Sequence, residues 1–182
     1  MHEVSLNQVI TDYLTGKEIE LTTYEDLRQA LARIMVEEKG YPKEAIVSKY
    51  PIALDVGDEK YFITVDFIVY YNGQPVMVLG FCPGAVSTFI TQYVSLARIL
   101  PEGPAPYVLI TDSKDAALVR TMDKKELCRG YHCIPTWEKL IELFQHAGDI
   151  SFSADRIKKE QRVAYAMFAL SDSCCTSECP TR

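Results

Sequence analysis

The stretch PVMVLGFC (75–82) constrains the fold more than any other part of the sequence, because it is apolar at odd and even positions alike. Side chains on a strand alternate between two faces, so a strand of this kind must be covered on both sides, as the central strands of α/β proteins are. Pro83 and Gly84 break the strand, and residues 86–100 then return to helical spacing. A strand followed by such a helix predicts a crossover to a parallel neighbour.

The remaining segments predict a mixed sheet covered by helices. Apolar and β-branched runs predict strands over 46–54, 61–70, 75–82, 107–111 and 116–121. Helical spacing of apolar residues predicts helices over 22–40, 86–100, 137–145 and 154–170. The expected fold class is therefore α/β (α+β), with a central mixed β-sheet flanked by helices.

The helix predicted at 22–40 has the clearest boundary signals. Thr22 and Glu25 have the S/T-x-x-E spacing of a capping box, in which each side chain satisfies a backbone N–H of the first turn. Gly40 and Pro42 predict its end. The expected inward stripe consists of Leu27, Leu31, Ile34 and Met35.

Composition sets the domain count and the excluded classes. At 182 residues, 48% of them hydrophobic, we expect one domain over 1–150, a C-terminal helix over 151–170 and a disordered, cysteine-rich tail over 171–182. No apolar run approaches the roughly 18 residues of a membrane span, and the first residues lack a secretion signal, so a cytoplasmic location is expected. The net charge of −6 argues against sequence-independent nucleic-acid binding, although a locally basic face can still exist.

The cysteines raise the question of a metal. Cys174, Cys175 and Cys179 offer three thiols, whereas structural zinc takes four ligands, so Cys128 or Cys133 would have to supply the fourth. The alternative, a tail of reduced thiols without metal, is favoured by this incomplete spacing. The histidines show no ligand or catalytic spacing, and they are His2, His132 and His146.

Several motifs in order resemble the restriction-endonuclease-like, PD-(D/E)xK fold, and more specifically the N-terminal domain of type I restriction enzyme R subunits. The matching pieces are DYLTGKEIELTTYEDLRQALARIMVEEKGYPKEAI (12–46), VDFIVYYNGQPVMVLGFCPG (65–84), QYVSLAR (92–98), PYVLITDSKDAALVRT (106–121) and IPTWEKL (134–140). The resemblance covers roughly residues 12–145, which is most of the chain.

In active members of that fold, an aspartate on one strand and a Glu-x-Lys on the next bind a divalent metal ion and position water. The resemblance places the aspartate at Asp66, the glutamate at Gly80 and the lysine at Cys82. Glycine offers no ligand, and a thiolate is a poor ligand for Mg²⁺, which takes oxygen ligands. Loss of catalysis is therefore expected, with no cofactor, and Mg²⁺ only if an active site survives.

Each of the matched polar residues also has a purely structural interpretation. The family's helix glutamate matches Glu25, which the capping box explains and which we favour as a cap. The glutamine of the family's Q-x3-Y motif matches Gln92, whose amide we expect to hydrogen-bond a strand end, and the tyrosine of that motif is Leu96 here.

The two strand positions have structural interpretations as well. Asp66 either marks the former metal site or pairs with Arg28 or Lys49, and both alternatives stay open. Cys82 is expected to behave as a small buried hydrophobic residue.

Strand register gives an internal test of this resemblance. Asp66 shares a face with Gly80 and Cys82 only if the hairpin pairs residues whose numbers add to an even value. A two-residue turn at Asn72–Gly73 would separate them. The resemblance thus predicts a three-residue loop, 71–73, pairing Tyr70 with Gln74, or an equivalent bulge.

Three functions follow as hypotheses. The first is a catalytically inactive module that binds nucleic acid or a restriction-system subunit. Its candidate contacts are Lys124, Lys125, Arg129, Lys158, Lys159 and Arg162, although interspersed acidic residues also fit a solvated helix face. The second is a protein-interaction or homo-oligomeric domain, which the acidic net charge favours. The third is a DNA endonuclease that uses Asp66, Glu25 and a migrated metal ligand.

Overall fold

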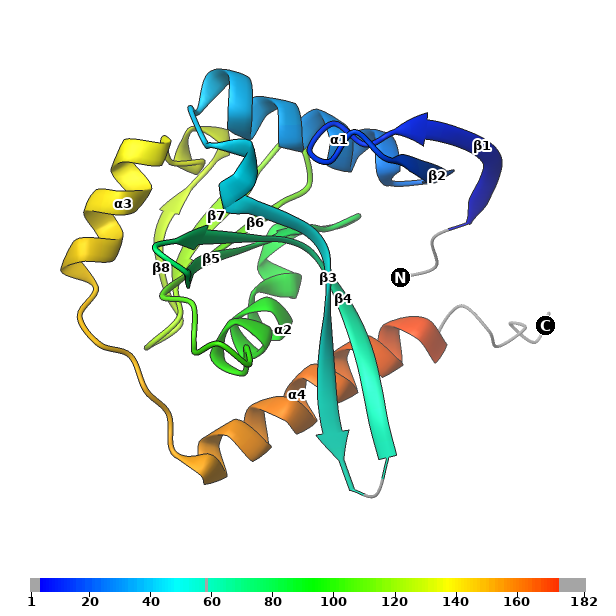
Figure 1. Cartoon of the computed structure of the whole chain (residues 1–182). Coiled ribbons are helices and arrows are strands. Elements are labelled where there is room, and N and C mark those ends of the chain that lie inside the picture. The colour runs from blue at the N-terminus through cyan, green and yellow to red at the C-terminus, as the bar shows by residue number, and fades with distance from the viewer. Residues whose placement is uncertain (1–3, 58, 174–182) are drawn as a thin grey trace.

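The computed structural model describes residues 4–57 and 59–173, which form a six-stranded mixed sheet, a separate two-stranded hairpin and flanking helices (Figure 1). The central sheet has the order β3-β4-β5-β6-β7-β8. Its strands are β3 (Ile46–Val56), β4 (Glu59–Tyr71), β5 (Gln74–Phe81), β6 (Tyr107–Thr111), β7 (Ala116–Arg120) and β8 (Lys125–Arg129). The separate hairpin consists of β1 (Ser5–Thr11) and β2 (Glu18–Thr22).

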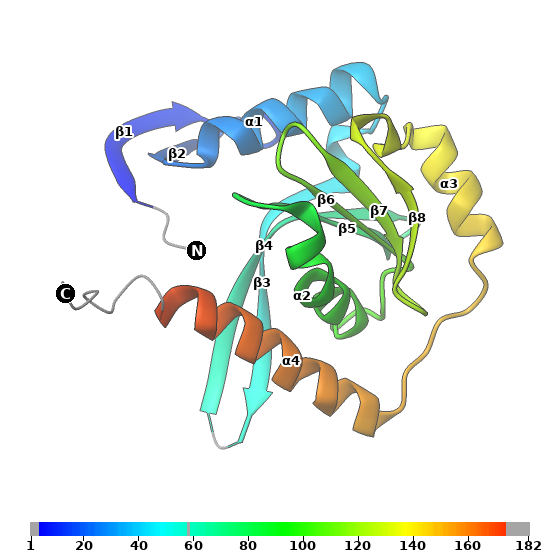
Figure 2. The same ribbon diagram turned by 180° about the vertical axis from the view of Figure 1, so that it is seen from behind.

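Helices cover both faces of the sheet and divide the core into two clusters. The helices are α1 (Glu25–Arg33), α2 (Val86–Arg98), α3 (Trp137–His146) and α4 (Ala154–Ser173). Leu31 of α1 and Leu140 of α3 pack with one set of strand residues, while Val94 of α2 and Ala164 of α4 pack with the other set. Figures 1 and 2 show these pairs of helices on opposite sides of the sheet. The α/β class predicted from the sequence is confirmed.

The central strand and its crossover are where the sequence predicts them. Every side chain from Pro75 to Phe81 in β5 is buried, and β5 lies between β4 and β6. β5 pairs in parallel with β6, and α2 makes the crossover between them. Among the described residues, no helix is long and apolar enough to cross a membrane.

The turn between β4 and β5 corrects one prediction and confirms its alternative. The loop has two residues, Asn72 and Gly73, both with positive φ (50° and 76°), and it pairs Tyr71 with Gln74. These are the torsions of the tight hairpin turn that asparagine and glycine favour, so the three-residue loop is wrong. The register then shifts between Val69 and Tyr70, so that Phe67 pairs with Leu79. This shift is the equivalent bulge, and the register, continued one residue beyond the Phe67–Leu79 pair, places Asp66 opposite Gly80.

The start of α1 differs from the predicted capping box. Thr22 is the last residue of β2, the helix begins at Glu25 after Tyr24, and no side-chain hydrogen bond caps it. The inward face also differs, because Leu31 and Met35 are buried whereas Leu27 is 37% exposed. The helix instead turns polar residues inward, and they are Glu25, Arg28 and Gln29. A π-helical turn, Ile34–Glu38, continues the helix to Gly40, whose φ of 74° ends it.

Three strands were not predicted, namely β1, β2 and β8. β1 and β8 carry mostly exposed residues without hydrophobic alternation, and β2 alternates over only five residues, with Leu21 buried. The helix predicted at 154–170 is α4, which is held to α2 by a buried ion pair between Arg98 Nη1 and Glu160 Oε1 (2.7 Å). Ser95 Oγ also donates to Glu160 Oε2 (2.6 Å).

Candidate functional site

Asp66 of β4 lies beside the carboxyl end of β5, within reach of α1 on one face of the sheet and α2 on the other. Its Oδ1 accepts from Arg28 Nε of α1 (2.6 Å), and its Oδ2 accepts from the backbone N–H of Phe81 (2.8 Å). The Tyr93 hydroxyl of α2 also donates to Oδ2 (3.2 Å). One half-buried carboxylate therefore joins a helix from each face to the central strand, and both of its oxygens are hydrogen-bonded. Of the two predicted partners, Arg28 is the one that pairs with Asp66.

Arg28 links Asp66 to Glu25, the carboxylate that the resemblance matches to the family's helix glutamate. Its Nη1 donates to Glu25 Oε2 (2.7 Å), and the Lys49 ammonium group contacts the same oxygen (2.7 Å). The side chains of Glu25 and Arg28 are 1% and 6% exposed. Two carboxylates thus face two cations in this cluster, and a guanidinium group occupies the position between the carboxylates. The interpretation of Glu25 as a helix cap is wrong, because its side chain is committed to this ion-pair cluster.

The cluster extends along α1 to the loop after β1. Gln29 Nε2 donates to Glu25 Oε1 (3.0 Å) and to Asp12 Oδ1 (2.8 Å). Burial alone would raise the pKa of Asp12, but hydrogen bonds from Thr15 and Gln29 outweigh it and lower that pKa. The N-terminal hairpin is in this way tied to the same polar network that holds Asp66.

The aromatic ring of Tyr93 packs directly against Gly80, opposite Asp66. A Cβ atom placed on Gly80 would lie 2.1 Å from Cζ and 2.2 Å from Cε1 of Tyr93. Tyr93 is 4% exposed, and its hydroxyl donates to Asp66 and to the Phe81 carbonyl (3.3 Å). Burial, followed by the nearby Asp66 carboxylate, raises the pKa of Tyr93 well above its ordinary value, so the ring stays a neutral phenol. The Tyr93 ring therefore fills the space that a side chain at position 80 would need.

Cys82 has the character predicted for it, that of a buried apolar residue. It is fully buried within the cluster that includes Tyr93 and Val86. Burial raises the pKa of its thiol to about 11, and Sγ donates weakly to the Gly84 carbonyl (3.4 Å). At neutral pH the group is a thiol, which neither binds Mg²⁺ nor supplies the charge of a lysine.

Gln92 does not play the predicted role. It is buried on α2, 4% exposed, yet its amide makes no hydrogen bond with the residues that the structure describes. The expected hydrogen bond to a strand end is therefore wrong. Its neighbour Tyr93, rather than Gln92, is the residue of α2 that contacts Asp66.

These residues do not fit a hard divalent ion such as Mg²⁺. Such an ion takes several oxygen ligands, and it would have to displace Arg28 from both Asp66 and Glu25. The strand opposite Asp66 adds no ligand at Gly80, and the Tyr93 ring fills the adjoining space. The arrangement is chemically that of a closed ion-pair cluster that ties α1 to the sheet.

The sequence alone did not indicate that Arg28 bridges both carboxylates or that Tyr93 covers Gly80. One signal was present, since a glycine inside a buried strand often marks the close approach of a neighbour. Tyr93 also lies on the α2 face that the periodicity predicts to be inward. Lys49 was predicted as a possible partner of Asp66, but its ammonium group contacts Glu25 instead, from a position in β3 with a positive φ (50°).

Of the basic residues predicted to contact nucleic acid, two are hydrogen-bonded or ion-paired within the fold, and the other four are exposed without an ion pair to any described residue. Arg129 is bound to Glu126 and to Asp115 (3.2 Å), so its charge is neutralised within the fold. Lys124 donates to the Thr91 hydroxyl. The other side chains are exposed and have no ion pair with any described residue, and they are Lys125, Lys158, Lys159 and Arg162.

The cysteines predicted as zinc ligands lie in two separate parts of the chain. Cys174, Cys175 and Cys179 lie outside the described residues. Cys128 and Cys133, proposed as a source of a fourth zinc ligand, are joined by a disulfide bond. His132, which shows no ligand spacing in the sequence, lies within reach of both sulfur atoms, with Nε2 3.6 Å from Cys128 Sγ and 3.8 Å from Cys133 Sγ.

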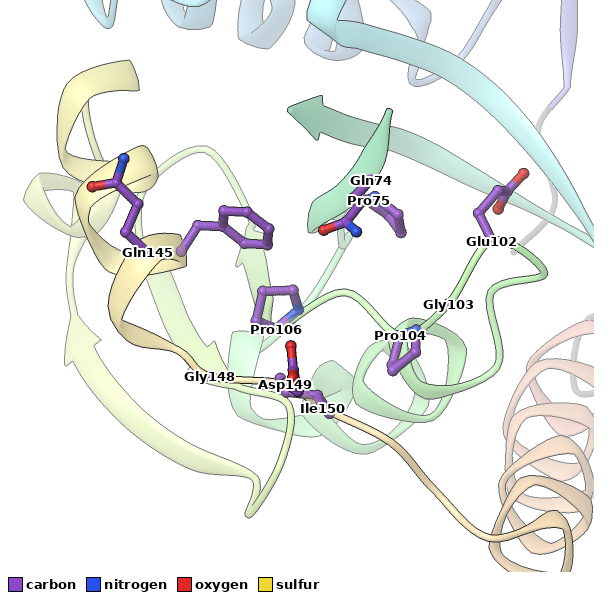
Figure 3. Close-up of a pocket in the computed structure, with 11 residues that line it drawn as sticks. Gln74, Pro75, Glu102, Gly103, Pro104, Pro106, Gln145, Gly148, Asp149 and Ile150 are labelled. Carbon is purple, nitrogen blue, oxygen red and sulfur yellow. The ribbon is translucent and has the colours of Figure 1, made fainter. Parts of the chain in front are cut away.

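A surface pocket lies at the other end of β5, away from Asp66 (Figure 3). Its volume is about 590 Å³, and Glu102 and Asp149 are its charged lining residues. Figure 3 shows it between the start of β5, the segment at Glu102–Pro106 and the end of α3. With acidic groups and no basic side chain in its lining, it is unsuited to phosphate.

Comparison with known proteins finds one family model that matches more than half of the chain. The family model described as type I restriction enzyme R protein N terminus matches residues 23–135. The matched region begins just before α1 and ends after β8, so it contains Glu25, Arg28, Asp66, Gly80 and Tyr93. No curated protein and no solved structure matches the chain.

Proposed function

Because the chain belongs to the family of the type I restriction enzyme R protein N terminus, we propose that it is a non-cleaving PD-(D/E)xK-type domain that binds nucleic acid or a restriction-system subunit. The observation that carries this proposal is the closed cluster at Asp66. Arg28 takes the place of a cation between two carboxylates, and Tyr93 takes the space of the missing ligand. The pairing of Asp66 opposite Gly80 supports descent from the strand pair that holds metal in active members.

Unpaired cations favour nucleic acid as the partner. Lys158, Lys159 and Arg162 are exposed on α4. Arg98 connects α4 to the β7–β8 turn, since it binds Glu160 and also donates to the carbonyl groups of Thr121 and Met122. The turn carries Lys124 and Lys125, so two basic groups are held on neighbouring elements. Phosphate contacts need unneutralised lysine and arginine of this kind, even in a chain of negative net charge.

An apolar depression favours a protein subunit as the alternative partner. It has a volume of about 90 Å³ and lies between α1 and the carboxyl ends of β5 and β6. Leu27 and Tyr131 line it and are each 37% exposed, so both apolar side chains are accessible at the surface. Small exposed apolar sites of this kind accept side chains of partner proteins.

A combined binding and cleavage assay tests the proposal. Labelled duplex and single-stranded DNA are incubated with the protein in Mg²⁺ or Mn²⁺, and bound and cut DNA are separated on gels. We expect a salt-dependent shift without cleavage. Replacing Lys158, Lys159 and Arg162 with glutamate should abolish the shift. Each phosphate contact removed should lower the slope of log affinity against log salt by about 1.

The matched control reverses three exposed lysines on other elements, namely Lys17, Lys114 and Lys139, which changes net charge equally. It should leave most of the binding intact. Cleavage that disappears in Asp66→Asn would contradict the non-cleaving assignment. A protein that neither shifts nor cuts DNA would exclude nucleic acid and leave the protein-subunit alternative.

A further inference from the structure

A turn remote from Asp66 brings two sulfur atoms and one imidazole together. Cys128 lies in β8, and Cys133 ends the short helical turn Tyr131–Cys133 that follows Gly130. Their Cα atoms are 5.6 Å apart, and their sulfur atoms form a disulfide. His132 Nε2 lies 3.6 Å from Cys128 Sγ and 3.8 Å from Cys133 Sγ. A disulfide alone requires no imidazole on both of its sulfur atoms.

The two nitrogen-to-sulfur distances are close to those between ligands of a tetrahedral zinc ion. With Zn–S near 2.3 Å and Zn–N near 2.0–2.1 Å, tetrahedral angles put a nitrogen and a sulfur ligand about 3.6 Å apart. The imidazole is therefore already placed, and the two sulfur atoms need only separate once their bond is broken. Soft thiolate and imidazole donors select zinc over hard ions such as Mg²⁺.

Gly130 allows this placement of the imidazole. Its φ of 103° lies in the region that favours glycine. A Cβ atom at this position would lie 3.0 Å from both Cε1 and Nδ1 of His132, which is closer than ordinary contact. A side chain at position 130 would thus push the ring away from the sulfur atoms.

We propose that the turn is a redox-controlled zinc site, with Cys128, Cys133 and His132 as ligands in the reduced protein. A dithiol reductant gives two electrons and two protons to the disulfide and itself becomes a disulfide, leaving two thiols on the chain. Zinc then displaces both thiol protons and binds the neutral imidazole through Nε2. Because His132 is exposed and Cys128 half-buried, the fourth position faces solvent and takes water or an external ligand. The site is independent of what the domain binds elsewhere.

Zinc titration of the full chain tests the site. Cys174, Cys175 and Cys179 are replaced by serine, so that thiols outside the turn make no contribution. The reduced protein is desalted without oxygen and titrated with Zn²⁺ against a chromophoric chelator. Co²⁺ is then used to detect thiolate-to-metal absorption. We expect binding of one ion per chain in the reduced form and loss of that binding on oxidation.

Single substitutions assign the ligands. His132→Ala should weaken Zn²⁺ binding by about a hundredfold, and Cys128→Ala should remove it together with the Co²⁺–thiolate absorption. His146→Ala is the matched control, since His146 is also exposed but lies on α3, where its Nδ1 is 2.7 Å from the Glu142 carbonyl. Circular dichroism verifies that each variant is folded. The proposal is overturned if the reduced chain binds no Zn²⁺, or if His132→Ala and Cys128→Ala bind it as tightly as His146→Ala does.

Discussion

Adding one methyl group at Gly80 is expected to destabilise this protein strongly. The Cβ atom of Gly80→Ala would lie 2.1 Å from the Tyr93 ring, which is buried and hydrogen-bonded to both Asp66 and the Phe81 carbonyl. The ring is only 4% exposed, so room for the methyl group requires the strand and α2 to move apart. We expect the free energy of unfolding to fall by about 3 kcal/mol, measured by urea denaturation.

The origin of that loss can be isolated with a double-mutant cycle. In a Tyr93→Ala background the added methyl group enters the space left by the ring, and alanine is otherwise better than glycine inside a strand. Gly80→Ala should then be neutral or stabilising, which gives a coupling energy of about 2–3 kcal/mol.

Gly84→Ala is the matched control. Its Cβ atom would lie 3.6 Å from Phe89, an ordinary contact, so it should change stability by less than about 1 kcal/mol. If Gly80→Ala costs no more than Gly84→Ala, the Tyr93 ring does not fill the site.

Removing the guanidinium group that bridges the carboxylates should have a comparable effect. In Arg28→Met, Asp66 and Glu25 each lose an ion-pair partner in a cluster whose side chains are mostly buried. Breaking a buried pair by removing one partner typically costs about 3–5 kcal/mol. Asp66 would keep no cationic partner among the described residues, whereas Glu25 would keep Lys49. Urea denaturation at neutral pH measures this loss.

Arg33→Met provides the comparison on the same helix. Arg33 is exposed and lies over the Tyr13 ring, with its Cζ 5.6 Å from the ring centroid, so its loss should cost about 0.5–1 kcal/mol. Arg28→Lys should recover only part of the stability, since one ammonium group cannot reproduce a fork that reaches two carboxylates. Equal losses for Arg28→Met and Arg33→Met would show that the bridge contributes nothing.

The parts of the fold that follow from hydrophobic pattern were predictable from the sequence. The apolar run of β5 predicts a central strand, and the helix after it predicts the parallel pairing with β6, as observed. β1 and β8 were not predictable in this way, because their side chains are mostly exposed and show no apolar face. β2 alternates, with Ile19 and Leu21 on one face, but over only five residues. Their stability depends on pairing with neighbours, which a local pattern does not record.

The candidate site at Asp66 was predictable only in part, for a different reason. The sequence places Asp66 and Gly80 on one face, provided that the hairpin contains a bulge, and the register shift after Val69 supplies it. The same sequence also predicts a capping box at Glu25, and that interpretation is wrong because Arg28 and Lys49 bind its carboxylate. A local motif and a long-range ion pair compete for the same side chain, and only the tertiary structure decides between them.

The most direct test of the account is the affinity of the Asp66 site for a divalent ion. Mn²⁺ binding is measured by electron paramagnetic resonance on the full chain and on Asp66→Asn, which keeps the side-chain size and the acceptor for the Phe81 N–H. We expect both proteins to bind Mn²⁺ equally weakly, because Arg28 already pairs with the carboxylate and Tyr93 fills the space beside it. One Mn²⁺ bound tightly by the unmodified chain and lost in Asp66→Asn would contradict this expectation, because Asp66 would then be a metal ligand.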